Sequence, residues 1–131
     1  MAKIALGPYL NGIPARVSEV KTASYQVTKE DNGTIFLTTG ATAAVVFTLP
    51  PITDGPFWFR FINCADVDMT VTAKVADTML TYNDLAADSI AFSTSSEKIG
   101  GEVEVICDGT TLIGLPRAAD GRYQTATIAT A

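Results

Sequence analysis

The sequence contains no histidine among its 131 residues. This absence excludes histidine-based catalytic triads and imidazole zinc sites, and it removes the commonest general base. Charge is also scarce, because only 18% of the residues are charged, and nine basic against fourteen acidic residues leave a net charge of −5. A negative net charge opposes binding to a phosphate backbone. We therefore expect no nucleic acid partner and no enzyme activity.

Long hydrophobic runs and cysteine-rich motifs are missing as well. The run 43–47 is only long enough for a strand, and the apolar start of the chain is interrupted by Gly7 and Pro8, so we expect neither a membrane partner nor export. Two cysteines, Cys64 and Cys107, are too far apart for a zinc motif. We expect both to be buried thiols. A disulfide between them is the alternative if their strands are neighbours.

The two ends of the chain differ from its middle. Gly7, Pro8, Gly12 and Pro14 interrupt residues 1–21, which predicts an extended N-terminal arm with a turn near residues 11–12. Residues 22–116 form the predicted β domain. Residues 117–131 form a C-terminal tail whose Thr- and Ala-rich end can either add as an edge strand or fray.

The middle of the chain is rich in short alternating segments. In Phe57–Ile62, the three phenylalanines fall on one face and Trp58, Arg60 and Ile62 on the other. Asn83 is a plausible N-cap for a single helical turn through Ala87. Short strands separated by turns every 8–12 residues or so predict an all-β fold, an antiparallel β-sandwich or jelly roll. The expected strands are 24–28, 34–39, 43–49, 57–62, 69–73, 78–82, 89–92, 102–107 and 111–115.

Candidate catalytic and metal-binding groups are weak. Asp66 and Asp68 could hold calcium, but they lack the rest of an EF-hand loop and are better explained as turn residues. Glu102 and Glu104 share a strand face, as a glycosidase pair would, yet a solvated strand face explains them better. We expect no catalytic residue, no cofactor and no metal.

Aromatic side chains give a rival hypothesis. Sugar rings stack on such groups, so they could form a carbohydrate platform. Core or subunit contacts fit the strand alternation better. The aromatic residues in question are Tyr9, Tyr25, Tyr82, Tyr123 and Trp58.

Two sets of residues are expected to contact a partner. The arm is too apolar for a solvated tail without contacts, and it carries basic residues that suit an acidic surface. The Trp58 face of residues 57–62 is too apolar for a fully solvated sheet, so we expect an arm or a second subunit to cover part of it. The predicted contact residues are Ile4, Leu6, Tyr9, Leu10, Ile13, Arg16, Trp58, Arg60 and Ile62.

A series of short motifs over residues 24–115 resembles a β-sandwich module of tailed-bacteriophage virion proteins. The first motifs are Tyr25-Gln26-Val27-Thr28, Asp31-Asn32-Gly33-Thr34, Thr39-Gly40-Ala41, Phe47-Thr48-Leu49-Pro50 and Phe57-Trp58-Phe59-Arg60-Phe61. The later ones are Asp77-Thr78, Ser89-Ile90, Gly100-Gly101, Val103-Glu104-Val105 and Cys107-Asp108-Gly109-Thr110. The chain is short and lacks the coiled-coil heptads of a fibre shaft, which favours the head decoration (cement) proteins among the module's users.

The resemblance implies a function and a set of partners. It implies a decoration protein that binds the outer surface of the assembled head and stabilises contacts between subunits of the major capsid protein. It also implies a homotrimer, located on the virion and assembled in the host cytoplasm. The alternative is a fibre module that binds a receptor or a carbohydrate.

Overall fold

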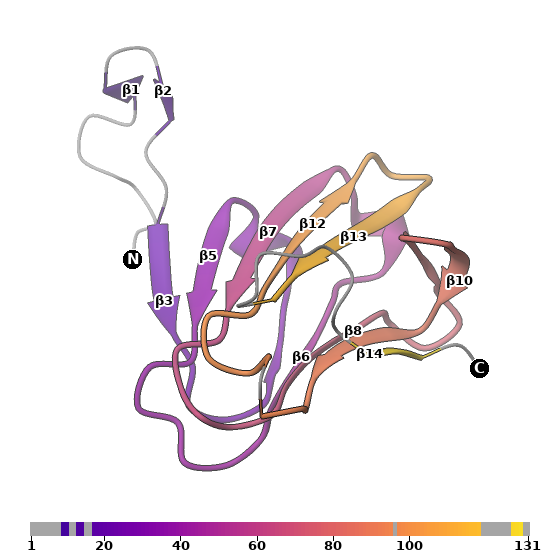
Figure 1. The fold of residues 1–131 in the computed structure, drawn as a ribbon. Helices are drawn as coiled ribbons and strands as arrows, with labels where there is room; N and C mark the ends of the chain where they lie inside the picture. The colour runs from indigo at the N-terminus through magenta and orange to yellow at the C-terminus, as the bar shows by residue number, and fades with distance from the viewer. Residues whose placement is uncertain (1–8, 11–12, 15–16, 96, 119–126, 130–131) are drawn as a thin grey trace.

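The computed structural model describes residues 9–10, 13–14, 17–95, 97–118 and 127–129. Within these residues the fold is all-β, as expected, with two short 3-10 helices, Lys29–Asp31 and Ile52–Asp54. The described residues contain no helix that is long and apolar enough to cross a membrane. Two sheets lie face to face as layers of a β-sandwich-like fold (Figure 1). Strands β1 (Tyr9–Leu10) and β2 (Ile13–Pro14) pair with each other and with no other described strand.

Seven strands form the larger sheet, in the order β10-β9-β13-β12-β7-β5-β3. Their bounds are β3 Val17–Val20, β5 Thr34–Leu37, β7 Phe57–Ile62, β9 Met79–Thr81, β10 Asp84–Ala87, β12 Glu102–Cys107 and β13 Leu112–Arg117. Five strands form the smaller sheet, in the order β14-β11-β8-β6-β4. Their bounds are β4 Tyr25–Gln26, β6 Val45–Thr48, β8 Met69–Thr72, β11 Ser89–Phe92 and β14 Thr127–Ala129.

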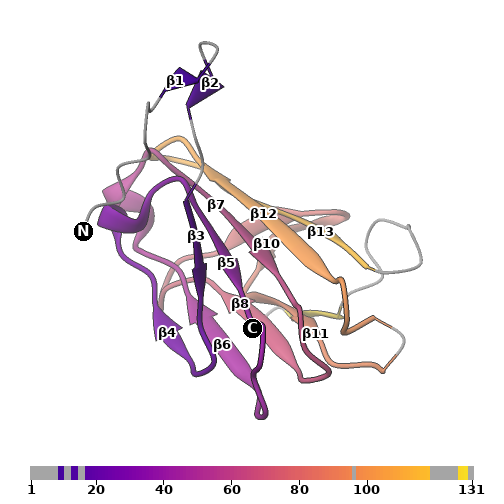
Figure 2. The same ribbon diagram turned by 90° about the vertical axis from the view of Figure 1, so that its left-hand side faces the viewer.

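The sheets are mixed, so the expectation of an antiparallel sandwich or jelly roll is not confirmed. From β3 to β8 the chain changes sheet at every strand, and Figure 2 shows the two resulting layers side by side. The chain therefore returns to a given sheet after forming one strand in the other sheet, and the returning strand runs in the same direction as the previous strand of that sheet. As a result β3, β5 and β7 are parallel, and so are β4, β6 and β8. After β8, the pairs β8–β11, β7–β12 and β12–β13 are antiparallel.

The ends of the expected β domain also differ from the structure. Val17–Val20, in the segment expected to be an arm, forms the edge strand β3. At the other end, β13 continues to Arg117, and Thr127–Ala129 in the tail pairs with β11 as an edge strand.

The helical turn expected after Asn83 is wrong. Asp84–Ala87 is a strand that pairs antiparallel with β9. Asn83 has φ of 58°. Asparagine tolerates this left-handed conformation, which suits the tight turn between two strands. The residue therefore turns a hairpin instead of capping a helix.

A cluster of phenylalanine rings lies in the core between the sheets. Phe57, Phe59 and Phe61 are buried, which confirms the alternation expected for this strand. Phe36 stacks on Phe61 with ring centroids 5.3 Å apart, and Phe47 from the other sheet lies 4.9 Å from Phe61. Because these rings face the core from β7, which lies between β12 and β5, the alternate side chains of β7 point outward.

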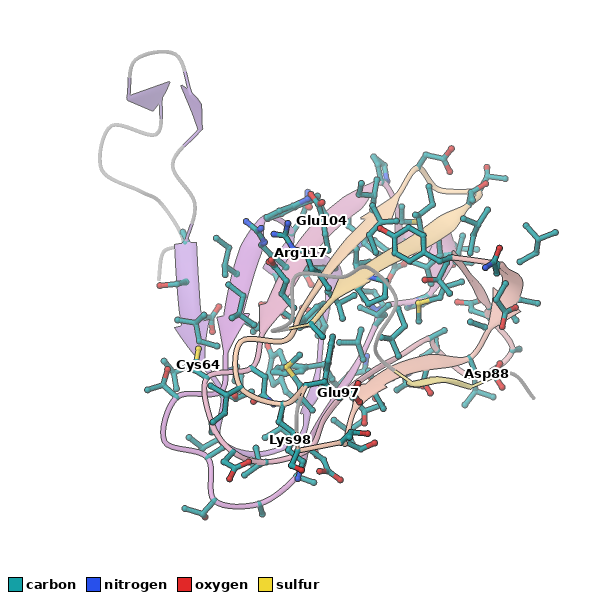
Figure 3. All side chains as sticks on the ribbon, viewed as in Figure 1. Cys64, Asp88, Glu97, Lys98, Glu104 and Arg117 are labelled. Atoms are coloured by element: carbon teal, nitrogen blue, oxygen red, sulfur yellow. The ribbon has the colours of Figure 1, made fainter. Side chains whose placement is uncertain are left out.

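The two cysteines are free thiols with different environments. Cys107 ends β12 on its core-facing side and is buried, as expected. The expectation that Cys64 is buried is wrong, because Cys64 follows the end of β7 and is exposed. Its backbone N–H donates to Thr38 Oγ1 at 2.8 Å, and its side chain is directed away from the core. Figure 3 labels Cys64 near β3.

Candidate functional site

The candidate site is the outer face of the seven-stranded sheet, the face that points away from the five-stranded sheet. Strand alternation places Trp58, Arg60 and Ile62 there, opposite the buried phenylalanines. Antiparallel pairing with β12 adds the side chains that lie opposite these three. The outer face comprises Val20, Ile35, Leu37, Trp58, Arg60, Ile62, Glu102, Glu104, Ile106, Ile113, Leu115 and Arg117.

Apolar side chains lie on both sides of a polar centre on this face. On one side, Val20, Leu37 and Ile62 follow one another across β3, β5 and β7. On the other, Ile106 lies opposite Trp58 and Ile113. Val20 and Ile106 are exposed, with 53% and 38% of their surface accessible, and the remaining apolar side chains are half-buried.

Glu102 forms the polar centre together with two arginines. Arg60 Nε donates to Glu102 Oε1 at 2.8 Å, and the Arg117 guanidinium donates to Glu102 Oε2 at 2.6 Å. Arg117 lies directly opposite Glu102 in the ladder, whereas Arg60 reaches it diagonally. The Glu102 side chain is only 17% exposed, so the carboxylate is held between β7 and β13 by charge-assisted hydrogen bonds.

The arginines decide how Glu102 titrates. Burial by itself would raise the pKa of this carboxyl, but the hydrogen bonds and charges of Arg117 and Arg60 outweigh burial and lower it. A general acid for glycoside hydrolysis needs a raised pKa. The direction found here suits a permanently charged structural carboxylate. Glu102 and Glu104 do share a face, opposite the buried Val103 and Val105, as expected from the sequence.

Trp58 connects the polar centre to the apolar part of the outer face. Its indole Nε1 donates to Glu104 Oε2 at 2.7 Å. Figure 3 shows Glu104 and Arg117 on the side of the larger sheet that faces away from β8 and β14. Beside them lies an open depression of about 290 Å³, lined by Arg60, Tyr82, Glu102, Glu104, Leu115, Pro116 and Arg117. The charges along this depression are largely engaged with one another.

The predicted contact residues separate into two groups. Trp58, Arg60 and Ile62 lie together on β7 as expected. Tyr9, Leu10 and Ile13 belong to the strands β1 and β2, and nothing is described of their side chains. Ile4, Leu6 and Arg16 lie outside the described residues.

Other candidates from the sequence have structural roles. Asp68 pairs with Lys98 at 2.9 Å, an interaction that raises the pKa of that lysine. Within the described ranges, no group of three His, Cys, Asp or Glu side chains is placed to hold a metal ion. The Tyr25 hydroxyl donates to the buried carboxylate of Asp31 at 2.9 Å. Of the candidate sugar-stacking tyrosines, Tyr82 lines the depression, and Tyr123 lies outside the described residues.

Sequence reasoning missed several residues of the outer face. It treated Glu102 as a solvated side chain and gave no role to Arg117, because the two are 15 positions apart and nothing local connects them. Val20 was assigned to the arm. The alternation of Val17-Ser18-Glu19-Val20 was the available signal for a strand at this place.

Comparison with known proteins finds no matching family model, no similar curated protein and no similar solved structure.

Proposed function

We propose that this protein is a non-enzymatic capsid decoration (cement) protein of a tailed bacteriophage. It binds the outer surface of the assembled head and stabilises contacts between subunits of the major capsid protein. The observation that carries the proposal is the outer face of the larger sheet, where Trp58 and Ile62 lie beside the Arg60–Glu102–Arg117 cluster. Tryptophan and arginine on a firmly packed surface are typical of protein–protein contacts.

The shape and chemistry of this face support a contact surface over a catalytic pocket. Small-molecule sites are usually concave and mostly apolar, with few polar groups aimed at the ligand. The depression on the outer face is open, and Glu102 there is paired with two arginines. A partner that docks here gains apolar burial on both sides of a charge cluster whose geometry is already fixed, which limits the entropy lost on binding.

The arm and the oligomeric state complete the proposal. The apolar and basic arm, residues 1–16, contacts the capsid or an adjacent subunit. The protein is a homotrimer in which Trp58 and Ile62 of the outer face are covered between subunits, since both side chains are only half-buried in a single chain. A stable monomer at micromolar concentration in sedimentation would contradict the trimer. Unchanged capsid binding after deletion of residues 2–16 would contradict the role of the arm.

The decisive experiment is cryo-electron microscopy of phage particles with and without the protein. We expect its density on the outside of the head, between major capsid subunits. In a companion binding assay on capsids that lack the protein, Trp58→Ala is expected to weaken binding about tenfold or more, as loss of a central aromatic anchor does. Val75→Ala is the matched control, because Val75 is 91% exposed on a loop outside the outer face. Density on the tail, or equal binding by both variants, would overturn the proposal.

A second candidate function is a fibre module that binds a receptor carbohydrate. It is favoured by Tyr82, which lines the same depression as Arg60 and Glu104 and so places a ring beside charged hydrogen-bonding groups. Binding on a glycan array that is lost in Tyr82→Ala and Trp58→Ala would support this candidate. Absence of glycan binding, together with density on the head, would favour the decoration proposal over this candidate.

A further inference from the structure

Strand β3 is the last strand of the larger sheet, with one long side that no described strand covers. It pairs with β5 on one side, and no strand among the described residues lies on the other. Figure 2 looks onto this edge and shows β3 in front of β5. An uncovered edge strand presents backbone donors and acceptors that can pair with a further strand.

The hydrogen-bond pattern identifies which groups are available. The backbone N–H of Lys21 donates to Leu37 O at 2.8 Å and therefore points toward β5. Backbone groups of successive strand residues point to opposite edges. The backbone N–H and C=O groups of Val17 and Glu19 thus point to β5, and those of Ser18 and Val20 point to the open side. Ser18 and Val20 are both exposed.

Two other edge strands offer less to an added strand. At β10, Asp84 Oδ1 accepts the N–H of Ala86 at 2.9 Å. Strand β4 is only two residues long, and the polar bonds beside it, from Val27 N–H to Thr48 O and from Val46 N–H to Ser24 Oγ, lie between β4 and β6. No side-chain bond is found along the outer edge at Ser18 and Val20 within the described part of the chain. The edge of β3 is therefore longer than that of β4 and free of the side-chain bond found at β10.

We propose that β3 pairs antiparallel with β3 of a second copy of this chain, about a two-fold axis at Val20. The two Val20 residues exchange N–H···O=C bonds, which joins the two larger sheets into one. This register places Glu19 of each copy opposite Lys21 of the other. Within one chain these two side chains already pair at 3.5 Å, so the strand carries a self-complementary charge pattern around Val20.

The charges also select this register over its neighbour. Pairing centred on Glu19 would place the two Glu19 carboxylates directly opposite each other, which is unfavourable. Pairing centred on Val20 avoids this and brings together two β-branched side chains, each 53% exposed in the single chain.

This contact goes beyond the proposed function and does not depend on it. It uses the backbone edge of β3, whereas the trimer and capsid contacts proposed above use the side chains of Trp58 and Ile62 on the outer face, and the arm. A two-fold edge contact between copies would link separate trimers if the trimer exists, and would form a dimer if it does not. Substitutions at Val20 and at Trp58 therefore separate the two proposals.

The first test is sedimentation of the full chain over micromolar to millimolar concentration. Val20→Pro removes the outward N–H but keeps the bonds to β5, a position where an edge strand accepts proline. We expect it to weaken the association that doubles the mass about tenfold or more, since two backbone hydrogen bonds are lost. Val20→Thr keeps the N–H and is the matched control. No mass-doubling association in the wild type, or one that Val20→Pro leaves unchanged, overturns the proposal.

A charge series tests the register without relying on proline. Glu19→Lys and Lys21→Glu each place like charges opposite one another and are expected to weaken the doubling. The double variant, Glu19→Lys with Lys21→Glu, restores opposite charges across the axis and is expected to restore association. Failure of the double variant to recover, with circular dichroism showing a folded protein, overturns this register.

A cross-link provides the final check on geometry. In the Cys64→Ser background, Val20→Cys places two thiols across the axis, at the Cα separation of about 5.5 Å that suits a disulfide. Mild oxidation is expected to give a covalent dimer, whereas Val75→Cys in the same background is expected to give none. Equal cross-linking at both positions overturns the proposal.

Discussion

The indole of Trp58 and the carboxylate of Glu104 lie 2.7 Å apart, N to O, across strands β7 and β12. They are diagonal neighbours, because Trp58 lies opposite Ile106 and Glu104 opposite Arg60. The bond fixes the ring over the sheet and holds its apolar surface next to Ile106. It therefore sets the shape of the outer face.

Loss of this bond has a measurable cost. Glu104→Ala is expected to lower the free energy of unfolding by about 1.5–3 kcal/mol, the usual range for a hydrogen bond to a charged group. Glu104→Gln keeps an acceptor oxygen and is expected to lose less. Urea denaturation, followed by fluorescence of the single tryptophan, measures both. Equal losses in the two variants would show that Glu104 stabilises the fold by its charge and not by this bond.

The Arg60–Glu102–Arg117 cluster predicts a pH dependence of stability. The arginines lower the pKa of Glu102 in the folded protein below its ordinary 4.5 despite its partial burial. A carboxyl whose folded pKa is lowered contributes stability above its unfolded pKa, and this contribution disappears as the pH falls through the folded pKa. Glu102→Gln lacks that contribution. We therefore expect the stability difference between wild type and Glu102→Gln to be largest at neutral pH and to shrink below about pH 4.

The control for this measurement is Glu30→Gln, which removes an exposed carboxylate by the same substitution. Its stability relative to wild type is expected to change much less with pH. A Glu102→Gln profile that runs parallel to the wild type from neutral to acid pH would contradict the role of the arginines.

Two buried threonines are expected to respond oppositely to the same substitution. The hydroxyl of Thr81 is buried without a hydrogen-bond partner among the described residues. Thr81→Val is thus expected to be neutral or to stabilise by up to about 1 kcal/mol, because valine removes an unsatisfied polar group without changing the shape. Thr38 donates to Asn63 at 2.6 Å and accepts the N–H of Cys64. Thr38→Val should cost about 1–3 kcal/mol.

Thermal and urea denaturation of these two variants side by side provides the comparison. Destabilisation of both variants by similar amounts would mean that the Thr81 hydroxyl bonds to a partner outside the described residues, such as a bound water.

The two thiols are expected to react at different rates. Cys64 is exposed, whereas Cys107 is buried, and burial raises the pKa of its thiol. A disulfide-exchange reagent should therefore modify one thiol quickly in the native protein and the second only on unfolding. Cys64→Ser should abolish the fast phase, and Cys107→Ser should leave it unchanged. Two equally fast phases in the native protein would contradict the buried position of Cys107.

The sequence alone determined the local structure of most strands, because side-chain alternation is a local property. Phe57, Phe59 and Phe61 alternate with Trp58, Arg60 and Ile62, so the buried and outer faces of β7 could be predicted. The spacing of short alternating segments and turns likewise predicted an all-β fold. Asn83 was ambiguous, since the same residue type caps helices and turns hairpins, and the pairing of β9 with β10 decided between these roles.

Only the tertiary structure decided which strands are neighbours and in which direction they run. Alternation looks the same in parallel and antiparallel strands, so the change of sheet at every strand from β3 to β8 left no local trace. The polar centre has the same origin: Glu102 meets Arg60 from 42 positions away because β12 inserts between β7 and β13. Contacts of this kind depend on long-range packing of the core. The edge position of β3 likewise followed only from its pairing with β5, its one partner among the described strands.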